Sequence, residues 1–344
     1  MNPVTTAVVV ALVGLAPTGA LLAARVRGVR RWRRSLVAFR VSIAADTDIA
    51  SVAQWLTAIS TWTHPGRWGF LPRTPIVIET VADIDGIGHY LVIPASYRAS
   101  LLAGLQALLP GARVEEAAYH VAQQAAWTVA GEWKLSTTSR PLNTDTAEHA
   151  NALIISGMQP LGAGEQIRIQ WILTGAHTPD PISRFMPAPA DAQWKFDNDT
   201  LIRDSESLRA RRDKQKYPLL RATGRVAVEA GNKPRARALF RRVWPAFQTM
   251  NAPGVALVRR HLPTRVVTRW IRLRRWPTAS WPLLLNVEEL AGLIGVPICG
   301  VALPGVTQSA SRLLPTPTSM AGEGGVTLGT TNYPGSNKPV TVQT

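Results

Sequence analysis

An uncharged apolar run followed at once by an arginine block constrains this 344-residue chain more than any other feature. Val4–Ala24 contains no charged side chain, and as a helix rising about 1.5 Å per residue it would span roughly 30 Å, the thickness of a bilayer's hydrocarbon core. Pro17 and Gly19 weaken such a helix, although spanning helices tolerate both residues. Positive flanks stay on the cytoplasmic side. We therefore expect residues 1–34 to be a single-pass inner-membrane anchor, N-terminus out, flanked by Arg25, Arg27, Arg30, Arg31, Arg33 and Arg34.

Two other interpretations of the run remain open. A secretory signal peptide carries its positive charge before the apolar run, and Met1–Pro3 has no charged side chain there, although Ala20, Ala23 and Ala24 resemble a cleavage site. A buried helix of a globular protein is the second alternative. We favour the anchor, which leaves the rest of the chain in the cytoplasm.

The composition indicates a folded body with an anionic partner. Hydrophobic residues make up 46% of the sequence, as in globular proteins, so the body is expected to form hydrophobic cores. The single Cys299 excludes an internal disulfide framework and fits a reducing compartment. The net charge is +16, which favours an anionic lipid surface or nucleic acid as a neighbour.

Strand-like and helix-like segments alternate through residues 35–178. A hairpin is indicated where Pro75–Val81 and His89–Ile93 flank the sequence DIDGIG, because Asp-Gly is typical of tight turns between strands. The other expected strands are Ser35–Ile43, Arg113–Ala117, Ala126–Thr137 and Gln166–Leu173, and the expected helices are Ile49–Ser60, Tyr97–Leu109 and 144–155. This order predicts an α+β fold, in which the transmembrane helix is followed by ferredoxin-like (split βαβ) sandwich modules.

Shifts in composition divide the chain after this first α+β domain. Residues 179–200 are expected to be a linker, because Pro and Asp recur there. Residues 201–313 are expected to form a second, basic α+β domain, with helices at Leu201–Lys216 and 233–247 around a strand at Leu219–Ala230. Residues 314–344 are rich in Thr, Gly, Pro and Ser, which indicates an extended C-terminal tail.

The sequence indicates no catalytic, cofactor or metal site. A phosphate-binding loop needs lysine after a glycine-rich turn, and the sequence contains no Gly-Lys pair. The six histidines lie neither four residues apart nor near the cysteine, so a zinc site is not indicated. Ser156 lacks the two flanking glycines of a nucleophile elbow. We therefore expect a protein that is not an enzyme.

Three arginine-rich segments are candidates for binding the phosphates of DNA or of anionic lipid. One lies in the helix Leu201–Lys216, the second in the helix 233–247, and the third in 259–275. A solvated charged face is the alternative interpretation of each. The candidate contacts are Arg211, Arg212, Lys214, Arg237, Arg241, Arg242, Arg272, Arg274 and Arg275.

Three phrases give the chain a resemblance to a known family. His89–Val114 (HYLVIPASYRASLLAGLQALLPGARV) reads as a strand ending in Pro, an amphipathic helix, Leu-Pro-Gly and a strand. Leu285–Gly300 (LNVEELAGLIGVPICG) and Gly329–Val340 (GTTNYPGSNKPV) follow in order. Together with the apolar run, these phrases resemble the region that precedes the motor in actinobacterial type IV secretion and conjugative DNA-transfer coupling ATPases.

The resemblance implies a function without implying catalysis. Members of that family are membrane-anchored ATPases that bring DNA or protein to a secretion channel. The sequence has no phosphate-loop lysine, so no ATP-binding residue carries over, and the motor domain is expected to be absent. We expect a non-catalytic accessory or docking domain, with a motor ATPase or channel subunit, membrane lipid, DNA and a second copy of the chain as candidate partners. The alternative is a stand-alone, membrane-tethered DNA-binding protein.

Overall fold

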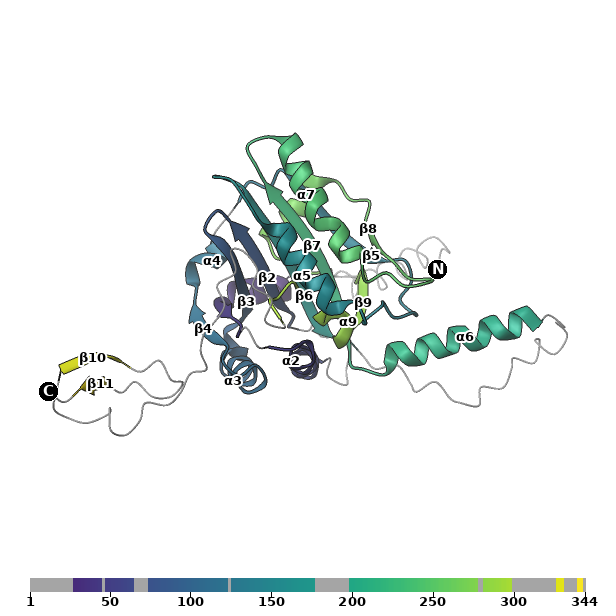
Figure 1. Cartoon of the computed structure of the whole chain (residues 1–344), viewed down its shortest axis with the longest axis horizontal. Coiled ribbons are helices and arrows are strands. Elements are labelled where there is room, and N and C mark those ends of the chain that lie inside the picture. The colour runs from purple at the N-terminus through teal and green to yellow at the C-terminus, as the bar shows by residue number, and fades with distance from the viewer. Residues whose placement is uncertain are drawn as a thin grey trace, which may run out of the picture.

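Nine strands form one antiparallel sheet through the centre of the protein, with helices on both of its faces (Figure 1). Two further strands, β10 (Val326–Thr330) and β11 (Pro339–Val342), pair separately in the predicted tail. The predicted membrane run, Arg25 and Cys299 lie outside the described residues. The computed structural model describes residues 27–44, 47–64, 74–122, 125–176, 198–277, 281–298, 326–330 and 339–342.

The first half of the sheet follows the connectivity β–α–β–β–α–β. Its strands lie in the order β4-β1-β3-β2, and each neighbouring pair is antiparallel. Asp48 begins the first helix by accepting a hydrogen bond from the Ser51 amide (2.7 Å), and Gly86, with φ of 135°, makes the hairpin turn. The elements are β1 (Leu36–Ser42), α2 (Ile49–Trp62), β2 (Ile76–Asp83), β3 (Gly86–Pro94), the short 3-10 turn Ala95–Tyr97, α3 (Arg98–Leu108) and β4 (Arg113–Glu116).

The second half repeats this connectivity in the same sheet. Its strands lie in the order β6-β7-β5-β8, which is the order of the first half read from the other side. A ninth strand, β9 (Leu283–Asn286), pairs with β7 beside β5 and leads into α9 (Val287–Ala291). The elements are β5 (Val129–Leu135), α5 (Ala147–Met158), β6 (Gln166–Gly175), α6 (Asn198–Gln215), β7 (Leu219–Glu229), α7 (Lys233–Gln248) and β8 (Leu257–Arg259).

The two halves join through their edge strands, β2 and β6. These strands pair over seven residues, from Ile76 opposite Leu173 to Ala82 opposite Ile167. Strand β6 also pairs with β7 over ten residues, so the segments on either side of residues 177–197 meet in one sheet. The sheet is therefore continuous from β4 to β8.

The predicted fold class, a transmembrane helix followed by ferredoxin-like sandwich modules, is wrong. The structure instead shows one α/β body built on a single large antiparallel sheet. None of the helices in the described ranges is both long and apolar enough to cross a membrane. Separate modules were expected because strand–helix patterns are local, whereas the pairing of β2 with β6 joins residues about ninety positions apart and leaves no local signal.

Each face of the sheet is covered by different helices. On one face, alternate residues of β6 such as Ile169 and Trp171 belong to the main hydrophobic core with side chains of α2, α5 and α7. On the other face, Val267 and Ile271 of α8 (Thr264–Arg272) pack on Ala130 and Ala227. Because both faces are covered, the polar residues Arg168 and Gln170 of β6, which alternate with Ile169 and Trp171, are also buried.

A buried carboxylate anchors α4 and the end of α8 to the sheet. Glu79 of β2 accepts hydrogen bonds from Gln170 Nε2 (2.7 Å), His120 Nε2 (2.6 Å) and both Nε and NH2 of Arg274 (3.1 Å each). Burial raises the pKa of Glu79, but the charges of Arg274 and Arg168 outweigh that effect and hold the pKa well below its ordinary value. Glu79 is therefore ionised, and its charge fixes α4 (Ala118–Ala122) and the end of α8 against β2.

The same polar row continues across the second half of the sheet. Gln170 lies opposite both Glu79 and Arg225 in the strand register. Arg225 donates to Gln170 Oε1 (3.2 Å) and to Glu132 Oε2 (2.8 Å), and Glu132 Oε1 accepts from Arg260 (2.7 Å). Every member of this row has a charged or amide partner, as buried polar groups require. The row thus links β2 to the residue that follows β8.

This row also holds the C-terminal end of α8. The carbonyl oxygens of Ile271 and Arg275 accept hydrogen bonds from Gln170 (3.0 Å) and Arg225 (2.7 Å). Arg274 takes a left-handed φ of 44°, where glycine is common at helix ends, and its amide donates to Ile271. The ion pair with Glu79 offsets the cost of that backbone conformation.

We expect Glu79→Gln to lower the free energy of unfolding by about 3–5 kcal/mol at pH 7, because it leaves the buried Arg274 guanidinium without its counter-ion. Urea denaturation measures this loss. Since the folded-state pKa of Glu79 is lowered, the stabilisation is fully present above the ordinary value of 4.5 and disappears as the pH falls from there through the lowered pKa.

Glu116→Gln is the matched control for this variant. Its exposed ion pair with Arg98 (3.0 Å) should contribute less than about 1 kcal/mol. A Glu79→Gln protein with the unfolding midpoint of the wild type would contradict the anchoring role of this carboxylate.

Candidate phosphate-binding groove

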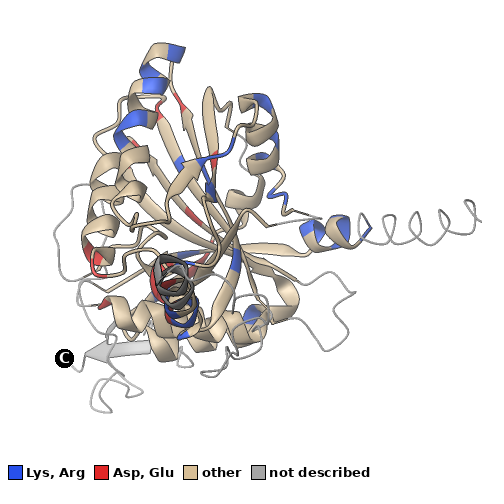
Figure 2. Ribbon diagram, turned by 90° about the vertical axis from the view of Figure 1, so that its right-hand side faces the viewer, with Lys and Arg blue, Asp and Glu red and all other residues tan. Residues whose placement is uncertain are grey.

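Helix α7 directs a row of cations away from the core. Asn232 begins the helix by accepting a hydrogen bond from the Arg235 amide (2.8 Å), and Pro234 occupies the first turn. Lys233, Arg237 and Arg241 then recur every four residues, so they lie on one exposed side, while Leu239, Phe240 and Val243 among others are buried. The helix at the top of Figure 2 is α7, and it is banded with Lys and Arg.

The remaining cations of α7 bind within the fold. Arg235 donates to both carboxylate oxygens of Glu165 (2.6 and 3.0 Å), and this hydrogen bond is the main cause that lowers the pKa of Glu165 to about 2. Arg242 donates to the carbonyl oxygens of Gly157 (2.7 Å) and Pro160 (3.1 Å). Helix α7 thus carries two kinds of cation: Arg235 and Arg242 bond other groups of the protein, whereas the row at 233, 237 and 241 is exposed.

A second wall stands opposite α7. Arg259 comes from β8, and Thr264 and Arg265 begin α8 directly after Pro263. Arg269 and Arg272 continue the exposed side of α8 beyond Arg265. Along the chain, β8, which pairs with β5, and the loop after it connect α7 to α8.

Aromatic rings line the space between the walls. The Arg259 guanidinium lies 5.2 Å from the centroid of the Phe240 ring, and Phe240 stacks on Trp244 at 5.2 Å with an interplanar angle of 20°. Gly131 of β5 makes room for this arrangement: a Cβ atom there would lie 2.9 Å from Phe240 and 3.2 Å from Trp244. The missing side chain at Gly131 lets the aromatic pair and Arg259 approach the strand.

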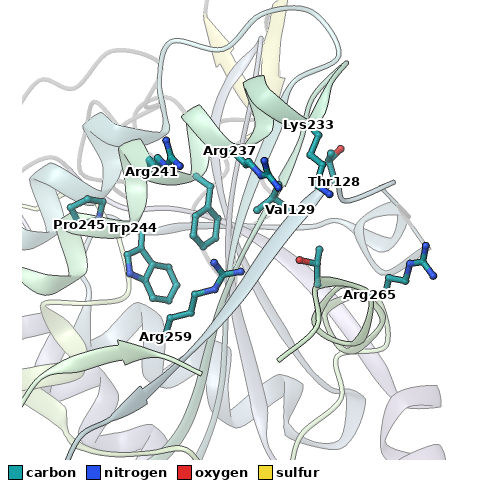
Figure 3. Close-up of a pocket in the computed structure, with 11 residues that line it drawn as sticks. Thr128, Val129, Lys233, Arg237, Arg241, Trp244, Pro245, Arg259 and Arg265 are labelled. Carbon is teal, nitrogen blue, oxygen red and sulfur yellow. The ribbon is translucent and has the colours of Figure 1, made fainter. Parts of the chain in front are cut away.

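Together these residues form an open pocket of about 820 Å³, which we call the basic groove. Its lining includes five cations and no acidic residue, and within the described ranges none of the five forms an ion pair. The N-terminal ends of α7 and α8 both border it, and each carries the positive end of a helix dipole. Figure 3 shows the lining: Thr128, Val129, Lys233, Arg237, Phe240, Arg241, Trp244, Pro245, Arg259, Thr264 and Arg265.

The acidic residues of the chain avoid this region. No Asp or Glu occurs in the sequence between Glu229 and Glu288, a stretch that contains both α7 and α8. The corresponding helix of the first half, α3, carries only Arg98, which pairs with Glu116. Two halves with the same connectivity therefore differ in charge, and the basic groove belongs to the second half alone.

The structure separates the predicted phosphate contacts into groups. Arg237 and Arg241 line the basic groove, and Arg272 and Arg275 are exposed at the far end of α8, where Arg275 lies 5.7 Å from the Trp270 ring. Arg211 and Arg212 are exposed on α6, which lies on a different side of the body in Figure 1.

Three other predicted contacts are committed to structural interactions. Arg242 bonds the carbonyls after α5, and Arg274 is buried against Glu79. Lys214 is buried and donates to both oxygens of Glu289 (2.8 and 2.5 Å), whose carboxylate also accepts from the Asn286 amide at the start of α9. Burial lowers the pKa of Lys214, and the charge of Glu289 opposes that effect.

Three further residues of the groove, Lys233, Arg259 and Arg265, lie within the predicted arginine-rich segments but were not among the candidate contacts. Lys233 precedes Arg237 and Arg241 at the same four-residue spacing. No local pattern indicates that Arg259 and Arg265 share a site with Arg237 and Arg241, since they reach the groove only when β8 and α8 fold against β5.

Five of the six predicted membrane-flanking arginines lie in the described part of the chain, where residues 27–34 are helical. Trp32 of this helix is buried and contacts Trp276 edge to face at 6.4 Å. Arg27, Arg30, Arg31 and Arg34 are exposed. Arg33 is half-buried, and burial together with the charge of Arg274 lowers its pKa.

The described part of the chain contains no group of three or more His, Cys, Asp or Glu side chains that could hold a metal ion. Comparison with models of known protein families finds no match, and comparison with curated proteins finds none either. The resemblance to the coupling ATPases therefore stays a prediction.

We expect Gly131→Ala to lower the free energy of unfolding by about 1–3 kcal/mol, because the added methyl group overlaps the Phe240 ring. Thermal unfolding followed by circular dichroism measures the change. Gly231→Ala is the control, since a Cβ atom at position 231 meets nothing within 4 Å and should leave the midpoint unchanged. Equal midpoints for the two variants would show that Gly131 does not limit the packing of the groove.

Proposed function

We propose that this chain is a non-catalytic accessory protein that binds the phosphate backbone of DNA in the basic groove. The observation that carries the proposal is the set of five cations without ion-pair partners around one open pocket. Exposed cations normally repel one another, so a fold that gathers them without a carboxylate fits an anionic ligand. Phosphates accept hydrogen bonds from guanidinium groups in bidentate geometry.

The location of the groove supports a polymer as the ligand. The groove is open, and exposed Arg269 and Arg272 extend its cationic side along α8. A small phosphate compound would need only the pocket, whereas a nucleic acid contacts many cations in succession. The overall net charge of +16 adds a long-range attraction to such a polymer.

The resemblance of the sequence to conjugative DNA-transfer ATPases favours DNA among the nucleic acids. It also makes a motor ATPase or a secretion-channel subunit the expected partner. Copurification from cells tests this partner independently of DNA binding: recovery of the chain without such a subunit would favour the alternative, a DNA-binding protein that acts alone.

We expect the double variant Arg237→Ala/Arg241→Ala to bind DNA roughly ten- to hundredfold more weakly at moderate salt, because two phosphate contacts are lost. Fluorescence anisotropy with a labelled duplex of about 20 base pairs measures the affinity. The slope of log K against log salt concentration should fall by about 2, since each phosphate contact in duplex DNA contributes roughly 0.9.

Arg235→Ala is the matched control, because it removes one positive charge from the same helix on the side that faces Glu165. Its affinity and its salt slope should stay close to those of the wild type. If net charge alone determined binding, Arg235→Ala would lose about half as much in log K as the double variant, which removes two charges, and a loss of that size would contradict the role of the groove.

A further inference from the structure

The two aromatic rings of the basic groove, the buried Phe240 and the partly buried Trp244, stack on other groups of the protein. Phe240 is 7% exposed and lies between the Arg259 guanidinium and Trp244. Trp244 in turn stacks on the buried Trp133, at 4.8 Å with an interplanar angle of 14°, and Trp133 stacks on Trp171 at 5.6 Å. The result is a continuous column that leads from the core to Arg259.

Stacking within this column competes with stacking of a nucleobase, because Phe240 is buried and Trp244 already stacks on both Phe240 and Trp133. Proteins that bind single strands without sequence preference stack bases on exposed aromatic faces. A base could reach Phe240 only by displacing Arg259, which also donates to the Ala130 carbonyl oxygen (3.1 Å). The rings therefore position a cation instead of receiving a base.

Cations occupy both sides of the groove. Figure 3 shows Lys233, Arg237 and Arg241 along α7, with Arg265 across the pocket from them. Along α7 the three side chains are separated by about 6 Å for each step of four residues. Cations on opposite sides of one open groove offer separate contacts to the two phosphate backbones that border a groove of a duplex.

The chemistry of the lining also favours backbone contacts. Its side-chain donors are guanidinium, ammonium, two threonine hydroxyls and the indole N–H of Trp244, and it includes no Asn, Gln, Asp or Glu. Phosphate oxygens only accept hydrogen bonds, so they suit this lining fully. Amide and carboxylate side chains, which read adenine and cytosine edges, are missing from it.

We propose that the basic groove holds the two backbones of a nucleic acid duplex and does not stack the bases of a single strand. This inference rests on the proposed function and specifies its ligand. Arg259, held by Phe240, contacts the backbone at the centre of the groove, and the α7 and α8 rows contact the strands on either side.

The test compares three labelled probes on the full chain by fluorescence anisotropy: a duplex of about 20 base pairs, one of its strands, and the same strand made fully abasic. The strand and its abasic form carry the same phosphates, so their affinity ratio isolates base stacking. We expect the duplex to bind about tenfold more tightly than the strand, and the strand and its abasic form to agree within about twofold.

If a base stacked on the protein, the single strand would instead bind about 5- to 150-fold more tightly than its abasic form. That result would overturn the duplex inference but would leave the proposal of DNA binding intact. A single strand that binds as tightly as the duplex would also overturn it. Failure of all three probes to bind at low salt would overturn the proposed function itself.

The affinities of the single strand and of the abasic strand are then compared for the variant Trp244→Leu. Both affinities are measured on the same variant protein, so any loss of folded fraction cancels in their ratio. The ratio of strand to abasic strand should stay within about twofold of the wild type, whereas a drop of more than about fivefold would identify Trp244 as a base platform.

Discussion

The ionised carboxylate of Glu79 is the interaction on which the arrangement of this protein depends. It is fully buried, and a buried charge is tolerated only when it is paired and hydrogen-bonded. Its partners come from three separate places: Gln170 from the neighbouring half of the sheet, His120 from α4, and Arg274 from the end of α8. One side chain thus ties together the junction of the two halves and the helices on one face.

This anchor also determines where the basic groove can lie. Arg274, held by Glu79 in a left-handed conformation, ends α8 against the sheet, and the row through Gln170, Arg225 and Glu132 reaches Arg260 beside β8. Helix α8 is nine residues long, so with its C-terminal end fixed on β2 its N-terminal end is brought to the edge at β5 and β8. The first half of the chain contributes no residue to the groove but fixes one of its walls.

Local signals in the sequence predict the elements well and their assembly poorly. The Asp-Gly turn, the Asp48 cap and the Asn232 cap fix β2–β3, α2 and α7 because each depends on residues a few positions apart. Gln170 lies in the expected strand Gln166–Leu173, but no local pattern indicates that it is buried under α8. In the same way the spacing of Arg237 and Arg241 singles them out, whereas Arg259 and Arg265 join them only through the tertiary fold.

The repeated connectivity makes the difference in charge between the halves informative. If arginine were spread only by codon usage, the α3 and α7 helices would carry similar charge, since both follow a pair of antiparallel strands and cover the same face of the sheet. Instead α3 has Arg98, paired with Glu116, and α7 has an unpaired row of three cations that faces another helix start. Charge that is concentrated in one copy of a repeated architecture, and kept clear of carboxylates there, has a local cause. The proposed binding of a polyanion by the second half accounts for this concentration of charge, and the first half holds α8 in place beside the groove.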